Sequence, residues 1–325
     1  MRWSAVIVAT VLSSRTPVSS VLCIHAMTLF VAARVALEIL GLLMRVLVAG
    51  ATGFVGQHVV PQLIDRGHEI TIVARDEEKA RGFAWFKRVR FVRSDINNLS
   101  ADPVATFGAQ DAVVYLAWSG LPNYSLPFHF EENLPASYHF IKQWVQAGVD
   151  HVLVTGTCFE YGMRNGCLAE SMPTDPRNPY ALAKDTLRKF LESLREQSPY
   201  TLQWARLFYM YGPGQNAKSV LAQLDHAIDA GESVFNMSGG EQLRDYLPVT
   251  EVASRLATLV EHPDWDGIIN ICCGSPISVR RLVERHVAAR GAKINLNLGY
   301  YAYPTYEPMA FWGDGRRFAT LVVSR

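Results

Sequence analysis

A tyrosine and a lysine four residues apart can act together on one substrate. In the stretch "NPYALAK", residues 178–184, Tyr180 and Lys184 are separated by about one helical turn, so on a helix both side chains point the same way. A free phenol titrates near about 10, which makes it a weak acid at neutral pH. A nearby ammonium favours the phenolate and lowers that pKa. The spacing therefore predicts an acid–base tyrosine tuned by a lysine, although an exposed pair without a task has the same spacing.

A threonine upstream completes a set that suits ketone reduction. Thr157 ends the apolar stretch "HVLVTGT", residues 151–157, which is an expected strand. Its hydroxyl can hold the substrate oxygen while Tyr180 delivers a proton and Lys184 binds the ribose of a nicotinamide. The other interpretation of Thr157 is a hydrogen-bonded turn residue. We predict that Thr157, Tyr180 and Lys184 are catalytic.

A glycine-rich turn predicts where the dinucleotide cofactor binds. The stretch "VLVAGATGFVG" places Gly50, Gly53 and Gly56 between an apolar strand and a helix, with Phe54 and Val55 before the last glycine. Glycines allow a tight turn close to a pyrophosphate, and the helix start supplies amides and the positive end of its dipole. The spacing is GxxGxxG, which an ordinary strand-to-helix turn can also have. The strand before it, the helix after it and a second strand about twenty residues on favour dinucleotide binding.

The end of the next expected strand, "EITIVAR", bears on the choice of cofactor. An NAD site commonly has a carboxylate there for the ribose hydroxyls, but this chain has Ala74 followed by Arg75. A small residue and then an arginine suit a 2′-phosphate, so NADPH is favoured over NADH. Asp76 lies near enough to keep NADH open, and a solvated loop charge is the other interpretation of Arg75.

Two further strand ends are expected to line the same cofactor cleft. Asp95 and Ile96 follow the stretch "VRFVRS", and Asp95 can accept a hydrogen bond from the adenine amine or cap the start of a loop. Leu116, Ala117 and Trp118 end "DAVVYLAW", where the backbone would line the cleft, although Trp118 could equally belong to the core.

The order of the elements predicts an α/β fold with a doubly wound parallel sheet. From Arg45 to about Gly212 apolar strands alternate with helical stretches, as expected for a sheet that is covered on both faces. We expect a cofactor-binding Rossmann domain over residues 44–211. Residues 212–325 are expected to form mostly a smaller, interleaved substrate-binding lobe, with a strand near 268–273 returning to the main sheet.

Composition excludes several other classes of protein. The 325 residues carry a net charge of +1, and this charge lacks the basic excess that is typical of nucleic-acid-binding proteins. Five cysteines without a spaced framework are typical of reduced thiols in the cytoplasm, and without CxxC or HExxH no metal site is expected. Residues 1–43 are apolar and patternless, and we expect an extension outside the fold because a strong strand begins directly after Met44. A signal peptide or a membrane anchor is the alternative.

Seven motifs together resemble a known family. They are "VAGATGFVG", "DAVVYLAW", "VTGTCFEYG", "NPYALAK", "RLFYMYGPGQ", "LRDYLPVTEVA" and "NICCGSPISVRRLVE". From Met44 to about Gly315 the chain resembles the NAD-dependent epimerase/dehydratase family of the extended short-chain dehydrogenase/reductase superfamily, whose members act on nucleotide sugars. The resemblance implies catalytic roles for the threonine, tyrosine and lysine, cofactor roles for the three glycines, and a homodimer formed through helices near 132–148 and 179–197.

The resemblance also implies substrate-binding residues and shows departures from the family. Arg244 in "RDY" matches an arginine that often binds the sugar-nucleotide diphosphate, for which its fork of donors is suited. A salt bridge to Asp245 or another acid is the alternative. Tyr209 replaces an asparagine that commonly contacts the diphosphate. Glu160, three residues after Thr157, and Gln215 in "GPGQ" complete the expected substrate set.

These features predict an NAD(P)-dependent reductase of a 4-keto-6-deoxyhexose nucleotide. Dehydratases of the family have an acidic pair beside the threonine, whereas this chain has Cys158 and Phe159 there. A nucleotide-sugar 4-epimerase with bound NAD is the alternative, and a non-catalytic cofactor-binding regulator is a more distant one. The segment "FWGDGRRFATLVVSR" begins like the family's closing segment and stops before its usual final helix, so we expect a truncated or frame-shifted C-terminus.

Overall fold

The computed structural model describes residues 43–97 and 102–323, so nearly all of the extension expected at 1–43 lies outside the described residues. The compact unit that carries the expected site begins at Arg45. Among the described residues, no helix is long and apolar enough to cross a membrane.

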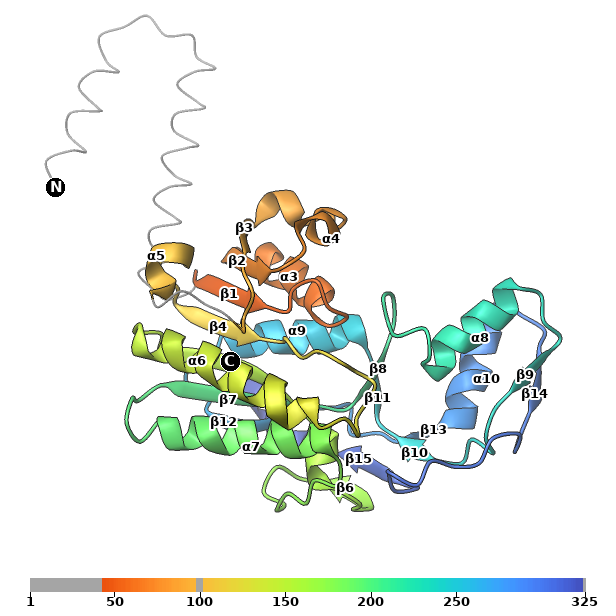
Figure 1. Ribbon diagram of the computed structural model, residues 1–325. Coiled ribbons are helices and arrows are strands. Elements are labelled where there is room, and N and C mark those ends of the chain that lie inside the picture. Colours follow the sequence, from red (N-terminus) through yellow and green to blue (C-terminus); the bar gives the residue numbers. More distant parts are fainter. Residues whose placement is uncertain (1–42, 98–101, 324–325) are drawn as a thin grey trace, which may run out of the picture. The chain divides into compact units, whose positions relative to one another are not determined.

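Seven parallel strands form one sheet (Figure 1). In spatial order they are β12 (Gly267–Ile271), β7 (Thr201–Leu207), β5 (His151–Thr157), β4 (Ala112–Tyr115), β1 (Arg45–Ala49), β2 (Glu69–Ala74) and β3 (Arg90–Arg93). The chain leaves β1 for β2 on one side, while β4 lies on the other. This reversal is where open parallel sheets bind ligands, at the carboxyl ends of the strands. The expected doubly wound parallel sheet is confirmed.

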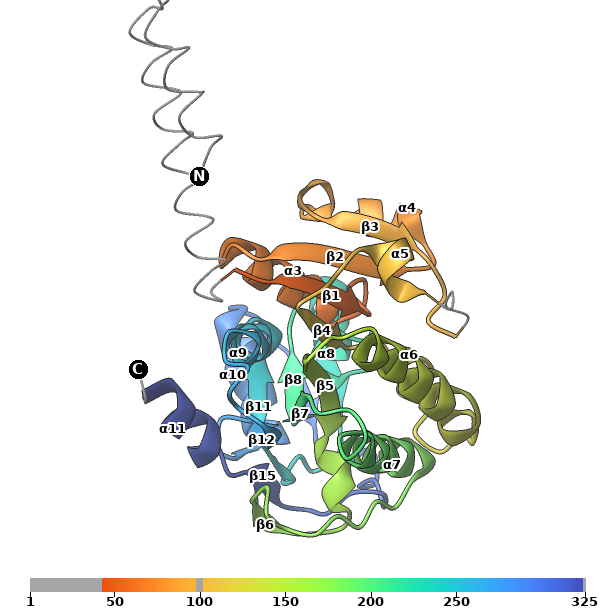
Figure 2. The same cartoon turned by 90° about the vertical axis from the view of Figure 1, so that its left-hand side faces the viewer.

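Helices cover both faces of the sheet (Figure 2). On one face lie α6 (Leu134–Gln146) and α7 (Pro179–Leu194), and on the other lie α3 (Gly56–Asp65) and α9 (Val249–Val260). Short helical segments at the strand ends are α4 (Glu77–Arg81), α5 (Pro103–Phe107), the 3₁₀ turns η1 (Phe86–Arg88) and η3 (Cys158–Tyr161), and the π-helical turn η2 (His129–Asn133).

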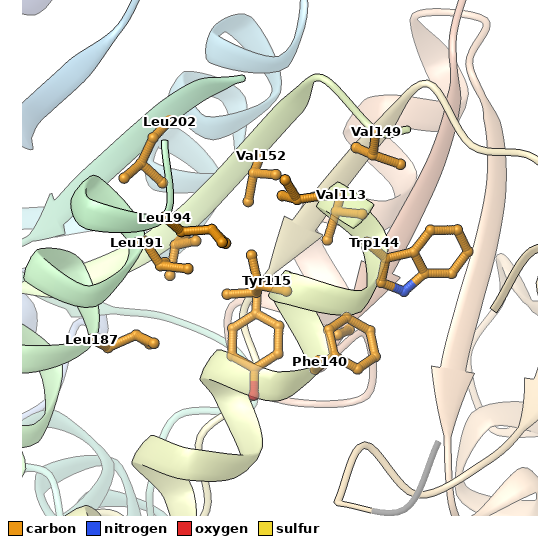
Figure 3. Close-up of a cluster of buried hydrophobic side chains, with 14 of the residues drawn as sticks. Val113, Tyr115, Phe140, Trp144, Val149, Val152, Leu187, Leu191, Leu194 and Leu202 are labelled. Atoms are coloured by element: carbon orange, nitrogen blue, oxygen red, sulfur yellow. The ribbon is translucent and has the colours of Figure 1, made fainter. Parts of the chain in front are cut away.

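The core between the sheet and the α6–α7 layer is built from large side chains (Figure 3). Val113 and Val152 come from β4 and β5, Trp144 from α6, and Leu187 and Leu191 from α7, all of them fully buried. Fully burying one such aliphatic side chain contributes about 1.5–3 kcal/mol. This packing fixes α7 against β5, and these two elements carry all three expected catalytic residues.

A smaller lobe follows the main sheet. It contains α8 (Val220–Asp229), α10 (Val279–Ala289) and the strand pairs β9 (Val234–Asn236) with β14 (Asn295–Asn297) and β10 (Leu243–Arg244) with β13 (Ile277–Ser278). Two further pairs are β8 (Tyr209–Tyr211) with β11 (Tyr246–Pro248) and β6 (Gly166–Leu168) with β15 (Phe311–Gly313), and α11 (Arg316–Val323) comes last. Because α9 packs on α3 and β12 joins β7 in the main sheet, the chain returns to the first lobe twice after residue 212.

Candidate active site

Two positions of the turn after β1 have no room for a side chain. Gly50 has a positive φ of 88°, and a Cβ there would come within 2.6 Å of the backbone nitrogen of Ala117 at the end of β4. A Cβ on Gly56 would lie 2.2 Å from the carbonyl oxygen of Gly50, whose oxygen also accepts the Gly53 N–H at 3.0 Å. The turn is therefore pressed against the neighbouring strand, as expected where the backbone must lie close to a ligand.

The helix that follows this turn begins without an anion of its own. Val55 is the N-cap residue of α3 and makes no side-chain cap, and the first turn of the helix has no acidic residue. The Gln57 and His58 N–H groups donate to the carbonyls of Gly53 and Val55, so it is the positive end of the helix dipole, with no acidic side chain beside it, that suits a phosphate group. Phe54 lies edge-on to His58, which bonds the carbonyl of Pro213 at 2.9 Å. The second lobe therefore touches the expected pyrophosphate turn.

The ends of β2 and β3 lie close enough for a charge contact. An Nη1 of the exposed Arg75 is 3.9 Å from an Oδ of Asp95. Asp95 also accepts the Asn97 N–H at 3.0 Å, which is the loop-capping role given as its alternative. Asp76 caps α4 by accepting the Lys79 N–H at 2.9 Å.

The end of β4 lines the same edge of the sheet. The Leu116 N–H donates to the Ala49 carbonyl at 2.8 Å, which continues the pairing with β1 up to the glycine turn. Ala117 is the residue that a side chain on Gly50 would strike. Ile96 and Trp118 are partly buried and pack against the core, so the core interpretation of Trp118 holds for part of its surface.

Tyr180 and Lys184 are held in place by the start of α7. Asn178 caps this helix by accepting the Ala181 N–H at 2.8 Å, and Pro179 occupies the first turn, where its missing N–H costs nothing. Tyr180 and Lys184 are both buried on the inner face of the helix. The sequence "NPYALAK" is thus a helix start whose inward face carries the two reactive groups.

Thr157 at the end of β5 interacts with Tyr180, and Lys184 follows Tyr180 one turn further along α7. Burial raises the pKa of Tyr180 well above its usual value, Tyr124 adds to this, and the hydrogen bond with Thr157 acts in the opposite direction. The ammonium of Lys184 donates to the carbonyl of Thr155 at 2.8 Å. The expected net lowering of the Tyr180 pKa is therefore wrong for this arrangement, because desolvation is the largest effect and keeps the phenol protonated.

Glu160 does not lie where a substrate could reach it. It is fully buried, and its carboxylate accepts the Thr157 N–H at 2.8 Å, the Trp204 indole N–H at 3.0 Å and the Arg206 Nε–H at 2.7 Å. With the Thr157 side chain accepting the Phe159 N–H, it forms the capping box of η3. The expected substrate role of Glu160 is corrected: its carboxylate is occupied inside the protein, where it positions Thr157.

Arg244 is paired with an acid that is distant in sequence. It is buried, lies with its guanidinium carbon 4.6 Å from the centre of the Phe311 ring, and has an Nη 3.2 Å from a carboxylate oxygen of Glu307. The Tyr209 hydroxyl donates to the other oxygen of Glu307. Asp245 instead accepts backbone N–H groups, including that of Cys273 at 2.7 Å. The structure thus brings Tyr209 and Arg244 together, with Glu307 between them.

Gln215 lies at the turn that joins the two lobes. Its Oε1 accepts the Gly212 N–H at 3.4 Å, and its own N–H donates to the Gly212 carbonyl at 3.1 Å. A Cβ on Gly214 would lie 2.1 Å from the side-chain nitrogen Nε2 of Gln57 on α3. Gln215 therefore shapes the turn that approaches the cofactor helix.

The sequence places this arrangement in a family. Residues 46–272, about 70% of the chain, match the NAD dependent epimerase/dehydratase family. The chain belongs to this family. Members of the epimerase/dehydratase family are enzymes, so the regulator without catalysis is set aside.

Two curated relatives and one solved structure show which members of the family the chain is similar to. The chain is 28% identical over 272 residues to dTDP-6-deoxy-L-talose 4-dehydrogenase (NAD(+)) of Aggregatibacter actinomycetemcomitans, an alignment that covers 83% of this chain and 99% of the relative. It is 26% identical to UDP-glucose 4-epimerase of Halalkalibacterium halodurans, over 74% of this chain and 79% of that one. The solved structure of MoeE5 in complex with UDP-glucose and NAD has a TM-score of 0.73 and 27% identity, and covers 86% of this chain and 92% of that chain.

Several residues of the site were not singled out from the sequence of this epimerase/dehydratase family member. Tyr124 lies beside Tyr180, with 5.5 Å between ring centres, and its carbonyl accepts the Tyr180 N–H at 3.1 Å. The ring centre of Tyr306 lies 6.3 Å from that of Tyr124. Both lie outside the family motifs, so no local pattern marked them. No group of His, Cys, Asp and Glu that could hold a metal ion occurs within residues 43–97 and 102–323.

Proposed function

We propose that the chain is an oxidoreductase that reduces a 4-keto-6-deoxyhexose nucleotide with a nicotinamide cofactor. The observation that carries this proposal is the placement of Thr157 at the end of β5 and of Tyr180 and Lys184 in the first turns of α7, with the Lys184 ammonium on the Thr155 carbonyl of the same strand. The glycine turn follows β1, so it lies at the same carboxyl edge of the parallel sheet. The relative from Aggregatibacter actinomycetemcomitans, a 4-dehydrogenase of a deoxysugar nucleotide, supports the substrate class.

The residues divide the work of ketone reduction between them. The nicotinamide supplies hydride chemistry when it is bound. Thr157 donates a hydrogen bond to the keto oxygen and so stabilises the negative charge that develops there. The Oη of Tyr180 delivers its proton to that oxygen, and its raised pKa keeps the proton available at neutral pH. Lys184 holds the ribose side of the cofactor.

Dehydration fits this site less well than reduction. Water elimination needs an acid and a base of the chain beside the reacting carbons, in addition to the tyrosine. The residues after Thr157 are Cys158, whose pKa is raised by burial, and Phe159. Glu160, the nearest carboxylate in this stretch, is held by Arg206.

A 4-epimerase is the second candidate, and the relative from Halalkalibacterium halodurans favours it. An epimerase uses the same tyrosine twice and keeps its cofactor bound. Incubation with a dTDP-4-keto-6-deoxyhexose and added reduced cofactor distinguishes the two candidates. Consumption of the reduced cofactor equal to the product formed supports the reductase. Interconversion of UDP-glucose and UDP-galactose without added cofactor would overturn it in favour of the epimerase.

Arg75 supports a preference for NADPH. Its guanidinium is exposed at the end of β2, and Asp76, the alternative partner for an NAD ribose, already caps α4. We expect Arg75→Ala to weaken NADPH binding about tenfold and to leave NADH binding nearly unchanged, because one charge-assisted contact to the 2′-phosphate is lost. Titration calorimetry with both cofactors measures this change.

The control for Arg75 is Arg88→Ala, which removes an exposed arginine that pairs with Asp65 instead. Equal affinities of the unchanged chain for the two cofactors, or a tighter fit for NADH, would contradict the preference. The solved structures of MoeE5 contain NAD, so this preference would separate the chain from them.

A homodimer through α6 and α7 is proposed from the resemblance and from the exposed surface of these helices. Leu182 and Phe190 of α7 are each 46% exposed, and Phe190 lies edge-on to Tyr138 of α6, with ring centres 5.5 Å apart. Exposed large apolar side chains on adjacent helices suit a four-helix interface. Sedimentation at micromolar concentration is expected to give a dimer, and Phe190→Glu is expected to give a monomer. A monomer of the unchanged chain would rule the interface out.

A further inference from the structure

Trp118 and His129 form a largely buried cluster with Lys184, next to the expected proton donor Tyr180. The proposed mechanism assigns no role to Trp118 or His129. The ammonium of Lys184 lies 4.0 Å from the centre of the Trp118 ring, so it faces the π-surface of the indole. The same ring lies edge-on to Tyr180, with centres 6.0 Å apart. Trp118 therefore contacts both members of the tyrosine–lysine pair, although it comes from a different strand end.

The indole is fixed by a histidine whose protonation state the contacts define. The Trp118 Nε1–H donates to Nδ1 of His129 at 3.1 Å, and Nε2 of His129 donates to the Asn123 carbonyl at 2.9 Å. This arrangement requires a neutral ring with its proton on Nε2. His129 is fully buried, and burial lowers its pKa, so the ring stays neutral at physiological pH.

Asn133 closes the network on the other side. Its amide lies 3.3 Å from Nδ1 of His129 and donates to the Ser119 carbonyl at 3.1 Å, while the Ser119 hydroxyl donates to its oxygen at 2.8 Å. His129 and Asn133 bound the π-helical turn η2 that precedes α6. Such turns are frequent at functional sites, and this one directs both side chains at the segment that carries Trp118.

We propose that Trp118, fixed by His129, is a positioning residue that holds the Lys184 ammonium charged and in place beside Tyr180. The part of this proposal that concerns turnover rests on the proposed function. The part that concerns the charge of the Lys184 ammonium does not depend on the proposed function. It rests on the contacts of Trp118 with Lys184 and His129.

The physical need for such a support is the burial of the lysine. Lys184 is 2% exposed, and burial lowers its pKa to about 7, opposed by the carboxylate of Glu160. Of the other groups around it, His129 and Tyr180 are neutral and supply no counter-charge, and the Thr155 carbonyl is its hydrogen-bond acceptor. The face of an indole attracts a cation, most strongly where water is excluded. Without it, the lysine would lose its proton at a lower pH.

The test is the titration of Lys184 in the full chain, followed by NMR with lysine labelled at the ε-carbon. The Lys184 signal is assigned by its absence in Lys184→Met. We expect Trp118→Leu to lower the midpoint of that titration by about one pH unit, which is the size of a buried cation–π contact. Trp118→Phe keeps an aromatic face and is expected to restore most of the shift.

The chain offers matched controls. Trp265→Leu removes another tryptophan that stacks on a histidine, His262, with ring centres 4.1 Å apart, and is expected to leave the Lys184 midpoint unchanged. His129→Leu removes the acceptor that fixes the indole, while His129→Asn retains an oxygen near the position of Nδ1. We expect a lower midpoint in the first and a midpoint near that of the unchanged chain in the second.

An unchanged midpoint in folded Trp118→Leu would overturn the proposal. If Trp118→Leu does not fold, the two His129 variants decide, and equal midpoints in them would overturn it. The titration needs no substrate, so it separates this proposal from the proposed function. When the chain turns over a nucleotide sugar, Trp118→Leu is also expected to lower kcat more than it raises KM, since the proposal has Trp118 act through Lys184.

Discussion

Tyr180→Phe is expected to lower kcat for the keto-sugar by about 10²–10⁴-fold, because that is the usual contribution of a positioned proton donor. The phenylalanine keeps the ring contacts with Tyr124 and Trp118 and removes only the hydroxyl that bonds Thr157. KM is expected to change little. Steady-state kinetics with the reduced cofactor measure both constants.

A second tyrosine serves as the control for this variant. Tyr200→Phe also removes a buried hydroxyl, which donates to the Leu191 carbonyl at 2.8 Å, at the other end of α7. It is expected to retain turnover. Undiminished turnover of every keto-sugar by Tyr180→Phe would show that the proposed mechanism is wrong.

Glu160→Gln is expected to lower the free energy of unfolding by about 3–5 kcal/mol, which is typical when one partner of a buried ion pair is neutralised. Both side chains of the pair with Arg206 are almost completely buried, and the Arg206 Nη atoms have no hydrogen-bond partner among the described residues. The guanidinium would be left buried with no counter-charge. Urea unfolding followed by circular dichroism measures the change.

The matched control is Glu251→Gln, which breaks the half-exposed pair with Arg255 one turn away on α9. A pair of this kind contributes about 0.3–0.5 kcal/mol. If Glu160→Gln costs no more than this control, the interior pair does not determine stability.

Much of the fold was predictable because its signals are local. The stretches that became β1 and β5 each contain a short apolar run, residues 46–49 and 152–154, and the helix α7 begins at an asparagine cap followed by proline. Such patterns depend on neighbours within a few residues. The glycine turn and the tyrosine–lysine pair were predictable for the same reason, since each is a short motif attached to one element.

The contacts that the sequence did not reveal join residues that are far apart along the chain. Glu160 and Arg206 are 46 residues apart, and Tyr209 and Glu307 are 98 apart. No periodicity links them, so Glu160 was expected to contact substrate although its partners lie in β7. Trp118 and His129 are 11 apart, but they meet only because the loop between them folds back before η2.

The pairing of Glu307 with Arg244 affects how the affinity for a diphosphate depends on salt concentration. Its carboxylate already neutralises Arg244 and accepts the Tyr209 hydroxyl. A diphosphate at Arg244, which the resemblance predicts, would therefore compete with an anion of the chain, and its binding would exchange one negative group for another. The net electrostatic gain is then the attraction between Arg244 and the diphosphate minus the attraction between Arg244 and Glu307. Affinity at this subsite should depend on ionic strength less steeply than it would for an arginine that awaits its ligand unpaired.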